Sequence, residues 1–298
     1  MKTKYLPAML GVAFLFGAGC QKSENTSSRS SNDDLRTQLM NSTNVLLQSG
    51  DFDGSPSLGF GTASGTVSVD NATASTAACK TITNDPSADV YPHTRTIVLN
   101  GCTTCDGYSV SGTKVTVFYV DPATASPGDL LSEETYSDLV VDGSTVSADT
   151  KTYLVSTSPL VLHVVSTKSV IQSGSDGGKR DYTSDRAWTR TAGDATADES
   201  DDVYSITGTE TGKEVLHGGT VANDVTSVID NPLIRANSCC HFTQGSQTIT
   251  ITGKTHGGFT VTEVLDYGAG TCDNAATLSI DGGAPQNVTI PLRFYPIP

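Results

Sequence analysis

The feature that most constrains this fold is a succession of about a dozen short β-rich runs, with almost no helical pattern between them. The runs are rich in Val, Thr, Ile and Tyr, which pleated strands favour, and turn residues such as Asp142-Gly143 separate them. They cover residues 94–99, 113–120, 134–141, 152–155, 160–171, 182–191, 203–209, 220–229, 248–253, 259–267, 276–280 and 288–292. Parallel strands would need longer crossover connections. The sequence therefore predicts an all-β antiparallel fold, either a β-sandwich or one large curled antiparallel sheet.

The composition agrees with strands and turns and argues against several classes of protein. Thr and Ser number 42 and 33 of the 298 residues, whereas a helical bundle would be rich in Ala, Glu, Lys and Leu. The formal net charge is −14, from 18 basic and 32 acidic residues. Because nucleic-acid binding needs a basic stripe, we expect no nucleic-acid partner.

The N-terminus has the three parts of a secretory signal peptide. Lys2 and Lys4 precede a mostly apolar run over residues 6–16, and small residues follow it. The run is too short to span a membrane, which takes roughly 20 apolar residues. Directly after the small residues, Cys20 resembles the lipid-attachment site of bacterial lipoproteins, although Gly17 stands where that signal usually has Leu. We expect Cys20 to be acylated; the alternative is an ordinary signal peptide in which this cysteine is incidental.

Acylation of Cys20 would make outer-membrane lipid a partner of this chain. Two or three acyl chains anchor a protein firmly, whereas one binds marginally at about 0.8 kcal/mol per buried methylene. Gln21 stands where Asp would resemble an inner-membrane retention signal, so we expect sorting to the outer membrane. Residues 20–24 also resemble the surface-export tag of lipoproteins in Bacteroidota-type bacteria. This favours display on the cell surface over a periplasm-facing orientation.

Four segments follow from these patterns. They are a signal peptide (1–19), the lipidated cysteine with a Ser-rich tether (20–32), a helix with a Gly/Ser-rich connector (33–65) and the antiparallel β domain (66–298). Asn32 would cap the helix and Gly50 would end it. A weak echo between residues 98–107 and 264–274 is consistent with two related halves of the β domain, and equally with chance.

Six cysteines remain after Cys20, and an even number in an exported chain favours disulfides. They are Cys79, Cys102, Cys105, Cys239, Cys240 and Cys272. We expect Cys79 to pair with Cys102 or Cys105. We expect Cys272 to pair with Cys239 or Cys240. The two remaining thiols could join the halves. A thiol redox motif at Cys102 and Cys105 would normally begin a helix in an α/β fold, whereas here it lies between two predicted strands. A zinc site would require the adjacent cysteines 239 and 240 to bind the same ion, which is geometrically awkward. Structural disulfides are therefore favoured.

No motif in the sequence points clearly to catalysis, a cofactor or a metal. Neither Gly-x-Ser-x-Gly nor His-Glu-x-x-His occurs. Residues 51–54 open like a calcium loop, but Pro56 and Thr62 stand where that loop needs Gly and Glu. The acidic cluster of Asp198, Glu199, Asp201 and Asp202 is typical of a solvated loop, with a calcium site as the less favoured alternative. We therefore expect no catalytic residue, no cofactor and no metal site.

One strand candidate carries an unusual set of side chains on one face. Its alternate residues are Arg180, Tyr182, Ser184, Arg186, Trp188 and Arg190, which include three of the eight arginines and the only tryptophan. Arg186, Trp188 and Arg190 would suit an anionic or carbohydrate ligand, through cation–π contacts and forked hydrogen bonds. The alternative is that the arginine stems pack on Trp188 and pair with carboxylates of this acidic protein.

Several segments together resemble a family of uncharacterised outer-membrane lipoproteins of Bacteroidota-type bacteria. They are residues 79–83, 91–100, 101–102 with 106–107, 111–114, 186–191 and 266–276, and the likeness spans roughly residues 79–292. The family has a cysteine between a Pro-Leu step and a Gly-Thr-Cys-Asp-Asn motif. In this chain Pro232-Leu233 is followed by Cys239 and Cys240, so the resemblance implies that one of these two cysteines pairs with Cys272. The presence of two adjacent cysteines, and of Cys105, departs from the family pattern. The resemblance implies a lipoprotein of unknown function and brings no catalytic residues.

These observations favour a lipid-anchored, surface-exposed lipoprotein with a binding or structural role. Its partner besides lipid would be a glycan or a protein. The alternative is a surface hydrolase that acts on glycans through paired carboxylates, which 32 acidic residues do not narrow to one pair. A binding or structural role is favoured over an enzyme.

Surface display makes a direct prediction. Protease added to intact cells that express a tagged form of the chain should remove the tag signal, because the protein would face outward. Immunoblotting before and after treatment measures this, and full protection of the tag would contradict surface display.

Overall fold

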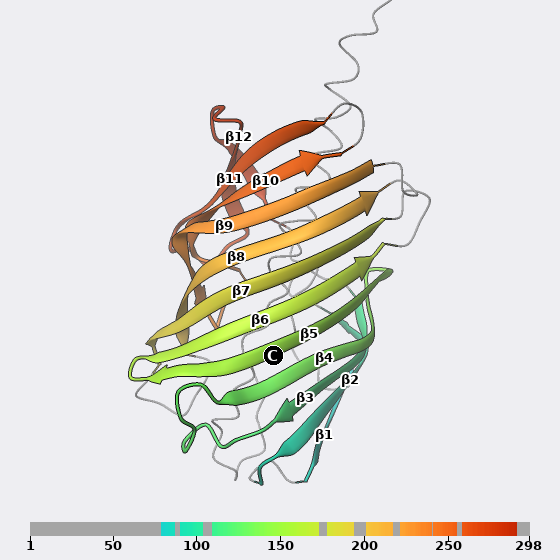
Figure 1. The fold of residues 1–298 in the computed structure, drawn as a ribbon, viewed down its shortest axis with the longest axis vertical. Coiled ribbons are helices and arrows are strands. Elements are labelled where there is room, and N and C mark those ends of the chain that lie inside the picture. The colour runs from blue at the N-terminus through green and yellow to red at the C-terminus, as the bar shows by residue number, and fades with distance from the viewer. Residues whose placement is uncertain are drawn as a thin grey trace, which may run out of the picture. The chain divides into compact units, whose positions relative to one another are not determined.

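The computed structural model of the chain describes residues 79–86, 90–103, 109–172, 178–193, 201–216, 221–239, 241–254 and 258–290. These residues belong to one compact unit and form a single antiparallel sheet of thirteen strands (Figure 1). Each strand is hydrogen-bonded to its neighbours in the sequence, so the sheet is one continuous meander. No α-helix occurs within these ranges.

The connections between strands are short enough to bring consecutive strands side by side. The strands are β1 Lys80–Asp85, β2 His93–Thr103, β3 Ser109–Phe118, β4 Leu130–Val141, β5 Ser144–Thr157, β6 Leu160–Ile171, β7 Lys179–Ala192, β8 Val203–Leu216, β9 Val221–Ala236, β10 Gln244–Gly253, β11 Phe259–Ala269, β12 Ala275–Ile280 and β13 Gln286–Thr289. Asp142 and Gly143 join β4 to β5 with φ angles of 47° and 78°. Positive φ at both central residues is typical of the two-residue hairpin turn that matches strand twist.

The predicted all-β antiparallel fold is confirmed, and each of the twelve predicted runs overlaps one strand from β2 to β13. Strand β1 is not among the predicted runs because its sequence, KTITND, is polar and lacks apolar alternation. The curled single sheet is the architecture observed. The sandwich alternative is not confirmed, since its two sheets would require a break that the hydrogen-bonded order from β1 to β13 does not contain. The signal peptide, the tether and the helix expected within residues 33–65 lie outside the described residues.

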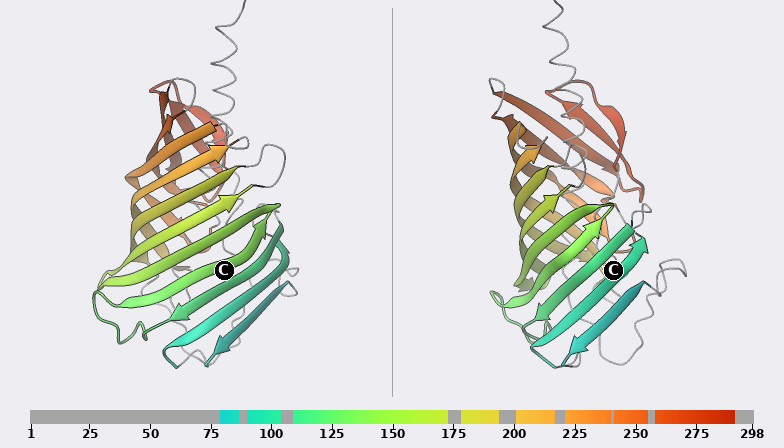
Figure 2. Two further views of the ribbon diagram at one scale, coloured as in Figure 1. Left: turned by 45° about the vertical axis from the view of Figure 1, so that its right-hand side comes forward. Right: turned by 90° about the vertical axis from the view of Figure 1, so that its right-hand side faces the viewer.

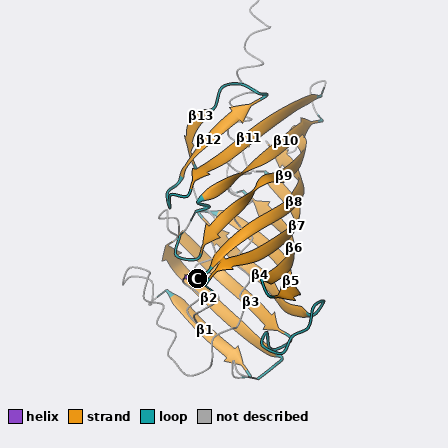
Figure 3. Cartoon of the chain, turned by 90° about the vertical axis from the view of Figure 1, so that its left-hand side faces the viewer, coloured by secondary structure: helices purple, strands orange, loops and turns teal. Residues whose placement is uncertain are grey.

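The sheet twists and curves across its width. In Figure 1 strands β4 to β9 lie in front and both ends of the sheet turn back behind them, as Figures 2 and 3 show from other sides. A register shift between β8 and β9 lies between Ile206 and Thr209, and Gly208 occupies it with a φ of 137°. Such irregularities bend strands and increase their twist, so they contribute to the curvature.

Alternation along the strands gives the sheet a buried face, here called the inner face, and an exposed outer face. Apolar side chains occupy both ends of the inner face. At one end a cross-strand row runs through Leu154, Leu162, Trp188, Ile206 and Leu233. At the other end a cluster includes Ile97, Leu99, Val141, Val146 and Val170. Full burial of one such side chain contributes roughly 1.5–3 kcal/mol.

Two disulfides close loops near the ends of the sheet. Cys79–Cys102 joins the residue before β1 to β2, and Cys239–Cys272 joins the segment after β9 to the segment before β12. Each bond is one of the two alternatives that the sequence predicted for Cys79 and for Cys272. The other two candidates, Cys105 and Cys240, lie outside the described residues. The sequence separations are 23 and 33 residues. In the chain-entropy view each bond stabilises the fold by about 3 kcal/mol.

Gly208→Ala should unfold the protein at clearly lower denaturant. A Cβ at this position would lie 2.2 Å from the Asp185 carbonyl oxygen and 2.8 Å from the Arg186 Cα, so the sheet backbone would have to move. We expect a loss of at least ~3 kcal/mol in unfolding free energy, measured by urea titration.

Gly101→Ala is the matched control for this substitution. Gly101 also has positive φ, at 66°, but a Cβ there would meet nothing within 4 Å. We expect only the cost of a left-handed alanine, about 1–2 kcal/mol. Equal losses for the two variants would show that close backbone approach is not what requires glycine at position 208.

Candidate functional site

A belt of polar side chains crosses the middle of the inner face between its apolar ends. It takes one residue from each strand from β3 to β9, and each is the cross-strand partner of the next. This polar belt consists of Thr116, Glu134, Thr150, Ser166, Ser184, Glu210 and Ser227, all of which are buried. Because buried polar groups require partners, their contacts are the first test of a structural role.

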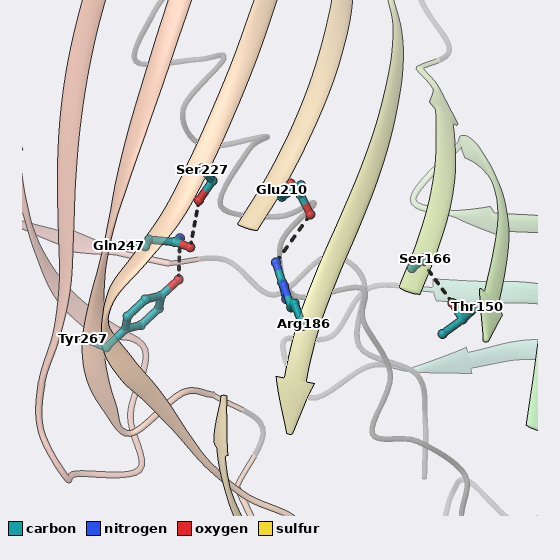
Figure 4. Close-up of polar contacts among 7 residues, drawn as sticks. All are labelled: Thr150, Ser166, Arg186, Glu210, Ser227, Gln247 and Tyr267. Atoms are coloured by element: carbon teal, nitrogen blue, oxygen red, sulfur yellow. Dashed lines mark hydrogen bonds and ion pairs between the residues drawn. The ribbon is translucent and has the colours of Figure 1, made fainter. Parts of the chain in front are cut away.

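Near β3 and β4 the polar belt is held by a buried ion pair. Lys114 Nζ lies 2.6 Å from Glu134 Oε2, and the Tyr136 hydroxyl donates to Glu134 Oε1 at 2.5 Å. On the next two strands the Thr150 hydroxyl donates to Ser166 Oγ at 3.1 Å (Figure 4). The carboxylate charge of Glu134 is therefore compensated within the sheet.

Toward β7 to β11 the contacts continue in the same way. Arg186 Nη2 lies 3.4 Å from Glu210 Oε2. Ser227 donates to Gln247 Oε1 at 3.3 Å, and Gln247 Nε2 donates to the Tyr267 hydroxyl at 3.1 Å. Figure 4 shows these side chains on adjacent strands, each reaching its neighbour across the sheet.

Beside the polar belt, the fully buried carboxylate of Glu214 collects three donors. Arg180 Nε lies 3.0 Å from Oε1, the Tyr182 hydroxyl donates to the same oxygen at 2.9 Å, and Asn223 Nδ2 donates to Oε2 at 3.3 Å. Burial raises the pKa of Tyr182 well above its ordinary value, and the negative charge of Glu214 raises it further. The phenol therefore stays protonated and acts as a donor.

The structure places the three predicted ligand-face residues on the inner face. Trp188 has no exposed surface and packs edge-on against Tyr204, with ring centroids 5.8 Å apart. Arg190 Nη1 lies 3.6 Å from Asp202 Oδ2, and Arg186 has Glu210 as its carboxylate partner. Each guanidinium thus has a carboxylate partner inside the protein.

A second candidate surface is an open hollow of about 740 Å³ over strands β5 to β9. Ten of its lining residues project from the outer face: Ser147, Asp149, Thr167, Ser169, Asp181, Thr183, Thr211, Lys213, Asp224 and Thr226. All ten are exposed or half-buried, whereas the residues between them, such as Tyr182, point to the inner face. Six of the ten are Ser or Thr, and these short side chains leave the space open.

Charges in the hollow alternate across three strands. Asp181 pairs with Lys213 across the sheet, and Lys213 pairs with Asp224. Each aspartate also has a lysine neighbour, because Lys179 lies 2.8 Å from Asp181 and Lys254 lies 2.7 Å from Asp224. The hollow therefore offers hydroxyls and carboxylates together with ammonium groups.

The protonation state of Asp181 matters for its chemistry. Partial burial alone would raise the pKa of its carboxyl, but hydrogen bonds from Lys179 and Ser169 outweigh this and hold the pKa below its usual value. Asp181 is therefore ionised at neutral pH and accepts hydrogen bonds.

Sequence reasoning did not single out the residues of the hollow. A signal for them exists, because short or charged polar residues alternate at positions 147 and 149, 167 and 169, 181 and 183, 211 and 213, and 224 and 226. Alternation assigns these side chains to one face of their own strand. It does not predict which residues of the neighbouring strands lie beside them, and the hollow is formed by residues of five strands together.

Comparison of the chain with protein-family models, with curated proteins and with solved structures finds no match. Within the described ranges, no helix is long and apolar enough to cross a membrane. The same part of the chain brings no three His, Cys, Asp or Glu side chains together as a candidate metal centre. The lipid-attachment residue Cys20 lies outside it.

Glu214→Gln tests the buried pair. The amide keeps the shape of the side chain but removes the charge that compensates Arg180, so we expect a loss of about 3–5 kcal/mol in unfolding free energy, measured by urea titration. The double variant Arg180→Met, Glu214→Leu removes both charges and should lose less than the single variant.

Lys254→Gln serves as the exposed control, since its ion pair with Asp224 is solvated and contributes at most ~1 kcal/mol. A Glu214→Gln loss as small as that of Lys254→Gln would show that Arg180 does not depend on this carboxylate.

Proposed function

We propose that this chain is a lipid-anchored, surface-exposed binding protein whose outer sheet face binds glycans in the hollow over β5 to β9. The anchoring part rests on the sequence, through Cys20 and the residues around it. The binding part rests on one observation: ten outward side chains, six of them Ser or Thr, line one open hollow.

The chemistry of the hollow matches that of a sugar surface. A hydroxyl group both donates and accepts, so Thr and Ser suit the many hydroxyls of a glycan. Threonine is stiff at χ1 because it is β-branched, which lowers the entropy lost when its hydroxyl is fixed by a ligand. The ionised Asp181 adds an acceptor of charge-assisted hydrogen bonds from sugar hydroxyls.

The outer face is preferred over the inner face as the binding surface for a physical reason. On the inner face Glu214 is 0% exposed and Arg186 is 3% exposed, and both already have ionic partners. A ligand there would have to replace these contacts and leave one charge buried without its partner, which costs several kcal/mol. The outward side chains of the hollow are exposed or half-buried, so a ligand there would not have to separate a buried ion pair.

Glycan hydrolysis by paired carboxylates is the alternative function. It requires one carboxyl with a raised pKa that can donate a proton to the leaving group. In the hollow, the pKa of Asp181 is shifted the other way, which suits hydrogen-bond acceptance. Binding without turnover is therefore the function that we propose.

The proposal predicts that glycan binding depends on the hydroxyls of Thr183 and Thr211, which are cross-strand partners in the hollow. Thr→Val at both positions keeps size and strand preference but removes the hydroxyls. We expect a fall of at least tenfold in the affinity for any glycan that the protein retains on an array, measured by calorimetry with the whole chain.

Thr145 and Thr207 are exposed on the outer face and do not line the hollow, so Thr→Val at both is the matched control. Its affinity should equal that of the wild type. Retention of no glycan, or equal binding by the hollow variant, would overturn the proposal. Release of shorter sugars from a bound glycan would favour the hydrolase instead.

A further inference from the structure

The outer face carries a row of threonines that crosses eleven strands. The row takes one residue from each strand from β1 to β11, and each is the registered partner of the next: Thr83, Thr96, Val115, Thr135, Asp149, Thr167, Thr183, Thr211, Thr226, Thr250 and Thr262. Nine of these eleven residues are threonine. We call this set the threonine row.

Strand preference alone does not explain the threonine row, because one of its two neighbouring rows on the same face is very different. That contrast row, two residues away on each strand, is Asp85, Thr94, Val117, Glu133, Lys151, Val165, Asp185, Thr209, Val228, Thr248 and Val264. It contains three threonines, four valines and four charged residues. Both rows are outward and β-paired, so strand preference alone does not set their composition. The row on the other side carries hydroxyls at Thr81, Thr113, Ser137, Ser147, Ser169, Thr252 and Thr260, but threonine itself is most frequent in the threonine row.

The geometry of the threonine row is that of a regular track. Neighbouring strands are about 4.8 Å apart, so the eleven positions, of which nine bear a hydroxyl, extend over about 48 Å. Each strand is also rotated by roughly 20–25° relative to the next, so the track follows a curve. A flat crystalline surface cannot follow that curve, whereas an extended polymer can.

The centre of the threonine row coincides with the hollow. Asp149, Thr167, Thr183, Thr211 and Thr226 belong to both. Asp149 is the only charged residue of the row, and its Oδ1 atom is buried without a hydrogen-bond partner. The residue as a whole is half-buried, so its carboxylate adds an acceptor at the centre of the row.

Charge selects among polymers. The threonine row contains no basic residue, and the chain has a net charge of −14, so an anionic polymer would be repelled. Lys213 lines the hollow between its registered partners Asp181 and Asp224, and Lys179 and Lys254 nearby are paired with the same aspartates. The ligand that fits is uncharged and rich in hydroxyls.

We propose that the threonine row binds a neutral, unbranched polysaccharide that runs across the strands, with the hollow as the centre of a longer track. This inference rests on the proposed function and names its substrate class. It differs from binding of a short glycan in the hollow, because residues far outside the hollow then contribute to affinity.

The test uses three sets of substitutions in the whole chain. The end variant carries Thr→Val at 83, 96, 250 and 262, which belong to the threonine row but do not line the hollow. The hollow variant carries Thr→Val at 183, 211 and 226. The control carries Thr→Val at 94 and 209 of the contrast row. Thr→Ser at the end positions restores the hydroxyls and should restore binding, and circular dichroism with thermal melts reports on folding.

The probes are neutral glucan, xylan and mannan polymers with their oligosaccharides of two to ten sugars, and the anionic polymers alginate and polygalacturonate. We expect wild-type affinity for a neutral series to rise with oligosaccharide length beyond the span of the hollow, and anionic polymers to bind at least tenfold more weakly. The end variant should bind the polymer at least tenfold more weakly while binding the shortest oligosaccharides normally.

The outcomes separate the two proposals. Normal polymer binding by the end variant, together with loss in the hollow variant, overturns the threonine row as a track and leaves the proposed function intact. Stronger binding of the anionic polymers overturns the neutral ligand. If the hollow variant binds as the wild type does, or if no carbohydrate binds, both proposals fail.

Discussion

The rest of the structure depends on the antiparallel hydrogen-bond ladder that joins each strand to the next one in the chain. From β1 to β13 no strand is skipped, so each new strand takes its register from the one before it. Because side chains alternate, a slip of one residue at any pair would exchange the inner and outer faces of every later strand. A slip between β3 and β4 would take Glu134 away from Lys114, and a slip between β7 and β8 would take Glu210 away from Arg186. Both faces are therefore consequences of one register.

The polar belt explains how a sheet with few aromatic residues encloses charged groups. Burial of a carboxylate costs several kcal/mol unless a partner compensates it. Lys114, Arg186 and Arg180 supply those partners from adjacent strands. Arg180 is the registered partner of Glu214, whereas Lys114 and Arg186 reach Glu134 and Glu210 diagonally, from two residues along the strand. Two apolar regions flank the polar belt and keep water away from it. The arrangement resists register slips, since a slip would separate the charges.

Much of the fold could be predicted from local pattern, and the exceptions have physical causes. Strand β6 shows the pattern well, because its buried residues alternate with more exposed ones from Leu160 to Ile171. Strand β1 lacks that signal, since five of its six residues are exposed at the edge of the sheet. The sequence also placed Arg186, Trp188 and Arg190 on one face. It could not identify Glu210 and Asp202 as the partners of the two arginines, because both belong to a different part of the chain.

By itself the sequence determined the strand class, the Asp142-Gly143 hairpin and the candidate cysteine pairs. Each of these depends on residues that are close together in the chain or on a count of residue types. Only the tertiary structure decided which cysteines pair and which threonines share a row. Thr83 and Thr262 belong to one row because ten successive strand pairings, with their bulges, set the register between them. The alternation of side chains within a strand depends only on nearby residues. The register between two distant strands depends on every strand pairing between them.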